Sequence, residues 1–254
     1  MQDWIEDRAA RLRRFFDLTP ETALLKNHHA LPEIAAPVQE HLSRFNIEWH
    51  IIPDADAVPM DEAYTKRLYP LCARDFAAGR AHAASCREAL VAGHARHQGR
   101  VIGVETTLKP RYLPGNRQYY GTPYGFDATA DPFAAYLSQA HFETGTRYAH
   151  NYASLREFVD VVNADWRARE RMPQGYRVTI CPPAVFNLVG RVFHQEWGDT
   201  ETLELGFYRD AHGNAKCYAV GSNGPGDFSY IRQIETNSDW TLLGFRMALV
   251  PDDK

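Results

Sequence analysis

Two histidines, a glutamate and an arginine lie within the segment HFETGTRYAHN, which spans residues 141–151. His141 and Glu143 stand two residues apart, and His194 follows later in the segment GRVFHQEWG. On a β-strand, residues two apart point to the same side, and two histidines with one carboxylate are the ligands of mononuclear non-haem iron sites. One interpretation is therefore a mononuclear metal-dependent oxidoreductase, with one divalent ion bound by His141, Glu143 and His194 at ligand distances of about 2.0–2.2 Å.

The other interpretation of His141 is a polar helix end followed by a turn at residues 143–145. The helix expected from residue 131 onward would end near His141, and residues two apart on a helix face different directions. His194 and Glu196 form a second His-x-Glu pair at the entry to a strand-rich region. This pair could act catalytically, as a general base with its orienting carboxylate, or it could be a solvated strand end.

A long segment rich in tyrosine and arginine, KPRYLPGNRQYYGTPYGFD, spans residues 109–127. Long loops inside a compact domain are usually functional, and guanidinium and aromatic groups suit an anionic or ring-bearing ligand. We expect a small polar or anionic ligand to bind in a cleft between this loop and the strand-rich C-terminal part. The candidate binding residues are Arg111, Arg117, Tyr119, Tyr120 and Tyr124. Alternatively, the tyrosines cover an edge of the core with their hydroxyls in solvent.

Composition narrows the classes of function. The chain has 254 residues and a formal net charge of −4, with basic residues scattered along it, which argues against nucleic-acid binding. No run approaches the roughly 20 apolar residues of a membrane-spanning helix, and charges occur throughout the first 18 residues. Four widely spaced cysteines form no CxxC pair. These features predict a cytoplasmic protein with a small-molecule partner, and they leave its oligomeric state open.

The hydrophobic pattern predicts a single α+β domain over residues 1–254. Residues 1–98 read as mainly helical, with one strand at 46–53, whereas 99–254 read as mixed with a β-rich tail. An amphipathic helix is expected over Trp4–Phe16, and its apolar stripe could either join the core or serve as a docking face for another protein. Thr19, with Pro20 after it, predicts the start of a second helix.

In the second half, residues 100–108 read as a strand and Ser154 begins a helix with an apolar stripe. The stripe consists of Leu155, Phe158, Val159, Val162 and Trp166. The tail alternates in the manner of strands, with a hairpin turn at 212–214.

Two short signatures near the C-terminus carry a resemblance to a known family. GYRV (175–178) leads into TICPPAVFNLVGRV, which reads as a helix, and WTLLGFRMALV (240–250) closes the chain. This order resembles the C-terminal third of the formylglycine-generating-enzyme (sulfatase-modifying factor) family. The resemblance implies a C-type-lectin-like fold, with Arg177 and Arg246 as structural arginines at loops and strand ends. It does not extend to the chemistry, because Cys181 and Cys217 lack the context of the family's copper-binding cysteines.

Overall fold

The computed structural model describes most of the chain, and all structural statements below concern that part. The described residues are 2–25, 34–59, 62–70, 74, 77–79, 87, 91, 97–108, 111–113, 117–120, 122–139, 146–148, 150–199, 203–209, 212, 214–221, 230–237 and 243–252.

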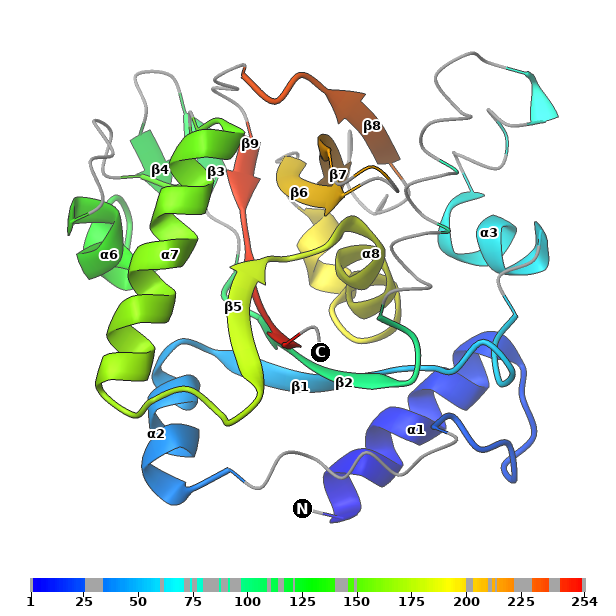
Figure 1. The fold of residues 1–254 in the computed structure, drawn as a ribbon. Coiled ribbons are helices and arrows are strands. Elements are labelled where there is room, and N and C mark those ends of the chain that lie inside the picture. The colour runs from blue at the N-terminus through cyan, green and yellow to red at the C-terminus, as the bar shows by residue number, and fades with distance from the viewer. Residues whose placement is uncertain are drawn as a thin grey trace.

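Helices dominate the first part of the chain and strands the last part (Figure 1), so the α+β class is confirmed. The helices are α1 (Gln2–Phe16), α2 (Ala36–Arg44), α3 (Glu62–Leu68), α6 (Ala134–Gln139), α7 (Tyr152–Ala168) and α8 (Pro183–Val192), with short 3-10 turns η1 (Ala128–Ala130) and η2 (Gln195–Asp199). The strands are β1 (Ile47–Ile52), β2 (Arg100–Glu105), β3 (Arg111–Leu113), β4 (Arg117–Tyr119), β5 (Tyr176–Ile180), β6 (Leu203–Arg209), β7 (Ala215–Gly221), β8 (Tyr230–Ile234), β9 (Leu243–Phe245) and β10 (Met247–Pro251).

Two four-stranded sheets form the framework. The first has the order β1-β2-β10-β5 with antiparallel neighbours, and the second has the order β8-β7-β6-β9, in which only β6 and β9 run parallel. Because only Arg246 separates β9 from β10, the C-terminal segment passes directly from the second sheet into the first. The end of the chain therefore ties the two sheets together.

Buried arginines lie at this crossing point. Arg246 donates to both carboxylate oxygens of Glu204 on β6 and to the carbonyl oxygens of Glu105 and Thr107. Arg147 donates to the carboxylates of Glu105 and Asp131 and to the carbonyl oxygen of Phe245. Such fully hydrogen-bonded pairs fix the register of the elements that they join. Arg246 thus connects β6 with the end of β2.

Helix α7 covers the first sheet beside β5 (Figure 1). A capping box at Asn151 and Ser154 begins it, and Asn163 accepts from the backbone N–H of Val178 and donates to its carbonyl oxygen. The predicted apolar stripe is confirmed, since four of its members are buried and Val159 packs against the same core cluster.

Helix α1 packs on β1 and α8. Ala9 and Leu12 are buried, and Ile5, Phe15 and Phe16 are half-buried against the same core cluster. The apolar stripe is therefore part of the core, and the exposed stripe that a docking face would require is not seen on the described residues of this helix.

Two local predictions were wrong. No helix begins at Thr19: residues 20 and 21 form a turn, and the hydroxyl of Thr19 lies 3.2 Å from that of Thr22. The segment expected to be a loop after residue 109 contains the antiparallel hairpin β3–β4, with Tyr112 opposite Gln118. A tight three-residue pairing leaves too short an alternating pattern to be recognised from the sequence.

Candidate metal centre

Strand β1 and the end of helix α8 bring two histidines and a glutamate together. Glu48 and His50 are two apart on β1, so their side chains point to the same side of the strand. His194 follows the C-cap residue Phe193 of α8, and its backbone N–H still donates to carbonyl oxygens of that helix. One ligand atom from each of these three side chains lies within 4.8 Å of the others. The group could therefore hold a metal ion.

His50 is wholly buried, and neither of its ring nitrogens has a hydrogen-bond partner among the described residues. Its ring lies 5.0 Å from the ring of Phe193 and 5.7 Å from that of His194, measured between centroids. Burial lowers the pKa of His50 well below 6.5, and the charges of Arg8 and His194 lower it further. The imidazole is therefore neutral at pH 7, which is the form that binds metals.

Glu48 is the member of the group that reaches solvent most. Its Oε2 accepts a hydrogen bond from Nη2 of Arg8 at 2.6 Å and lies 3.4 Å from Nε2 of His194. The contact with His194 is the main reason that the pKa of Glu48 falls to about 2, with Arg8 adding to the effect and burial opposing it. The side chain is a carboxylate at neutral pH and is 38% exposed.

Glu196 orients His194 from the far side of the ring. Its Oε1 lies 2.8 Å from Nδ1 of His194, which leaves Nε2 directed toward the group. The imidazole also stacks on Trp197, with centroids 4.9 Å apart and planes 11° apart, and the guanidinium of Arg246 lies 3.9 Å from the centroid of the same indole. A carboxylate on the second nitrogen is the usual support of a metal-binding histidine.

The sequence-predicted triad shares only His194 with this group. His141 and Glu143 lie outside the described residues, so their positions are not compared with it. His194 and Glu196 are in contact, as their proposed catalytic pairing requires, and their role stays a prediction. The pair Glu48-x-His50 was missed because NIEWHIIP was interpreted only as an apolar strand. Two polar side chains on one face of such a strand were the available signal.

The tyrosine- and arginine-rich segment forms an outer hairpin. Arg117 lies over the ring of Phe126 at 5.2 Å, and Tyr119 meets the same ring edge-on. Tyr124 and Phe126 are exposed. The hairpin places the remaining candidate, Arg111, opposite Tyr119 in register.

Tyr120 lies close to residues of the strand-rich tail. It lines a cavity with Asp131, Arg147, Glu204 and Arg246, and burial raises its pKa above the ordinary value. The cavity measures only about 10 Å³, which is the space of a single water molecule.

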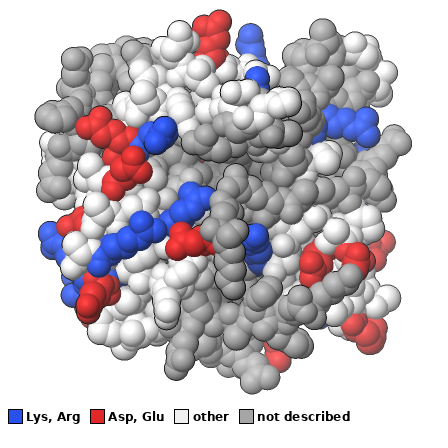
Figure 2. Space-filling model, viewed as in Figure 1, with Lys and Arg blue, Asp and Glu red and all other residues white. Residues whose placement is uncertain are grey.

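No protein-family model, curated protein or solved structure matches this chain. Within the described part of the chain, no helix is both long and apolar enough to cross a bilayer. Basic and acidic side chains are intermixed on the face shown in Figure 2. A concentrated basic surface is not visible among the coloured residues there.

Proposed function

We propose that this protein binds one divalent transition-metal ion through Glu48, His50 and His194. The convergence of the three ligand atoms within 4.8 Å is the observation that carries the proposal. Ligands at 2.0–2.2 Å from one ion lie no more than about 4.4 Å apart, so little side-chain movement is needed to close the group. The ring nitrogens of His50 have no hydrogen-bond partner among the described residues, and Glu196 orients the ring of His194. Both features favour metal binding.

Two imidazoles and one carboxylate are ligands suited to zinc or iron(II). The exposed side of Glu48 leaves room for water or a substrate on the ion, as in catalytic rather than closed structural sites. A bound ion would supply Lewis acidity or an activated water there. The oxidoreductase activity first considered for His141, Glu143 and His194 thus transfers, as a proposal, to this group.

Arg8 is a competing cation at the site. Its guanidinium contacts the Glu48 carboxylate at 2.6 Å, and its plane lies over the ring of Phe193 at 4.8 Å. In metal-free protein Arg8 balances the charge of Glu48, and it opposes the approach of a second cation. Removing this charge while keeping a polar side chain, as in Arg8→Gln, is therefore expected to raise metal affinity.

The test is a titration of chelator-treated protein with Co²⁺, followed by visible absorption and by metal content after desalting. We expect one bound ion per chain with nitrogen and oxygen ligands and without a thiolate charge-transfer band. Glu48→Gln and His194→Ala should weaken binding by more than the roughly 10–100-fold that loss of a supporting partner causes. Arg8→Gln should tighten it.

Glu40→Gln is the matched control, because Glu40 is exposed on α2 and pairs only with Arg44 among the described residues. His141→Ala separates this group from the triad that includes His141 and Glu143. The proposal is wrong if the wild-type protein binds no stoichiometric Co²⁺ or Zn²⁺, or if Glu48→Gln binds as the wild type does. If His141→Ala loses metal binding and Glu48→Gln retains it fully, the metal is bound by the sequence-predicted triad that includes His141 and Glu143.

Two further expectations stay predictions. One is a small polar or anionic ligand in a cleft between the tyrosine- and arginine-rich segment and the strand-rich tail, bound by Arg111, Arg117, Tyr119, Tyr120 and Tyr124. The C-type-lectin-like fold rests on the two C-terminal signatures alone.

A further inference from the structure

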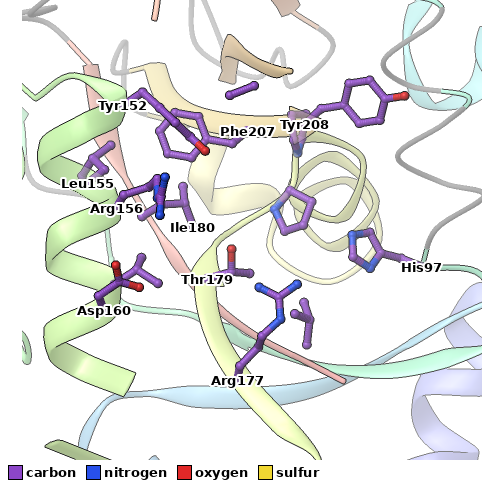
Figure 3. A pocket seen from close by; sticks show the side chains of 15 residues that line it. His97, Tyr152, Leu155, Arg156, Asp160, Arg177, Thr179, Ile180, Phe207 and Tyr208 are labelled. Atoms are coloured by element: carbon purple, nitrogen blue, oxygen red, sulfur yellow. The ribbon is translucent and has the colours of Figure 1, made fainter. Parts of the chain in front are cut away.

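A cavity of about 290 Å³ opens between α7, β5, the first turn of α8 and β6 (Figure 3). The cavity shares no residue with the metal centre. Gly206 lies against the lining residue Pro183, because a Cβ atom on Gly206 would lie only 2.7 Å from Cγ of Pro183. The missing side chain lets β6 pass directly against the start of α8. The volume is close to the lower limit of small-molecule sites, about 300 Å³.

Two arginines from different elements are directed into this space. Figure 3 shows the guanidinium groups of Arg156 and Arg177 on either side of the Thr179 hydroxyl. Arg177 and Thr179 share a face of β5 because they are two residues apart. Arg156 comes from the facing side of α7 and forms no hydrogen bond or ion pair with the described part of the chain. Two guanidiniums and a hydroxyl provide convergent donors for one anionic group.

The surrounding charges leave an excess of positive charge. Asp160 lines the cavity one helical turn after Arg156, without an ion pair between them. Asp252 lies 3.9 Å from Arg177 and 3.7 Å from Arg167, so one carboxylate is shared at long distance by two arginines. Among the residues that line the cavity, Arg156 and Arg177 therefore carry positive charge against the carboxylate of Asp160. The first turn of α8, which begins at Pro183, adds the positive end of its helix dipole.

The rest of the wall is apolar and aromatic. Tyr152 and Phe207 meet edge-on with centroids 4.9 Å apart, and Figure 3 shows both rings at one end of the cavity. Leu155 and Ile180 add aliphatic surface to the lining. A ligand here would meet a cationic end and an apolar end, which fixes its orientation.

We propose that this cavity is a binding site for a small ligand that carries a carboxylate or phosphate group on a flat apolar body. The anionic group lies between Arg156 and Arg177 with Thr179, and the apolar body packs toward Tyr152 and Phe207. The site is independent of the proposed metal centre. A failure of one therefore leaves the other unaffected.

The test uses phenyl phosphate and benzoate as probes of the full chain, in calorimetric titrations with inorganic phosphate for comparison. We expect saturable 1:1 binding of phenyl phosphate or benzoate, and the tighter of the two identifies the anionic group. Arg156→Gln and Arg177→Gln should each weaken binding about tenfold, because each removes a charge-assisted contact. Val159→Trp places an indole at the helix-side wall and should abolish binding without a change of charge.

Arg44→Gln is the control of equal charge change, because Arg44 is exposed on α2 and contacts Glu40. It should bind the probes as the wild type does, and thermal melting should show that all variants are folded. The inference is overturned if neither aromatic probe saturates, or if both arginine variants and Val159→Trp retain wild-type affinity. Equal weakening by Arg44→Gln would show a general charge effect and would also overturn it.

Discussion

Replacement of His50 by leucine should stabilise the metal-free protein. The ring is wholly buried, and both nitrogens lack partners among the described residues. A buried polar group without a hydrogen bond costs about 1–3 kcal/mol, and leucine has a similar volume with no such requirement. We therefore expect His50→Leu to raise the free energy of unfolding by about 1–3 kcal/mol in the presence of EDTA.

Bound metal should reverse the order of stability of the wild type and the His50→Leu variant. An ion that binds only the folded wild type adds about 2.7 kcal/mol when its free concentration is 100 times its dissociation constant. His50→Leu removes one of the three ligands, so the variant should gain far less from the same zinc concentration. The expected pattern is thus a variant that is more stable than wild type without zinc and no more stable, or less stable, with it.

Urea unfolding followed by circular dichroism, with EDTA and then with excess zinc, measures both quantities. His212→Leu serves as the control, since His212 is exposed in the turn between β6 and β7 and should change stability by no more than about 0.5 kcal/mol. A His50→Leu protein that is less stable than wild type in EDTA would refute the reasoning, because it would mean that the buried ring is already satisfied. An equal response to zinc in both proteins would exclude His50 as a ligand.

Further predictions concern the supporting residues and the core. Glu196→Ala should weaken Co²⁺ binding about 10–100-fold in competition with a chelator, because it frees the ring that it orients. Arg147→Met should lower the free energy of unfolding by about 3–5 kcal/mol in urea, since it leaves two buried carboxylates without their partner. Burial first, and Arg171 second, lower the pKa of His41, so its NMR titration midpoint should fall below 6.5, and its contribution to stability should decrease as pH falls below 6.5. Burial raises the pKa of Cys217 to about 12, and this thiol should resist alkylation at pH 8 until the protein is unfolded.

Patterns of long, regular period could be predicted from the sequence. The stripe from Leu155 to Trp166 specified α7 and its buried face, and the alternation in the tail specified β6 to β8. These elements could be predicted from the local sequence, because burial of one face of a helix or strand places apolar residues at a fixed spacing. The hairpin β3–β4 was not predicted, because each strand has only three residues.

The candidate metal centre was predictable in kind and only partly in position. The rule that one histidine and one carboxylate lie two apart on a strand, with a distant second histidine, describes Glu48, His50 and His194. His141-x-Glu143 matched this rule first. The pair Glu48-x-His50 has the two residue types in the reversed order and was not recognised, because it lies within an apolar strand. Which strand approaches the end of α8 depends on long-range packing, in which α1 contacts both β1 and α8. Local periodicity carries no information about such long-range packing.

The contrast between two kinds of buried polar group supports a functional role for the metal centre. Arg147 donates five hydrogen bonds, and Arg246 donates four, so these charges are satisfied and serve the fold. His50 and His194 instead leave three buried ring nitrogens without a hydrogen-bond partner among the described residues, and Nε2 of His194 lies 3.4 Å from the carboxylate of Glu48. A fold selected for stability alone would replace such a histidine with an apolar side chain, because each unsatisfied nitrogen opposes folding. Unsatisfied ligand atoms gathered around one carboxylate are the state expected of a site that is completed by a metal ion.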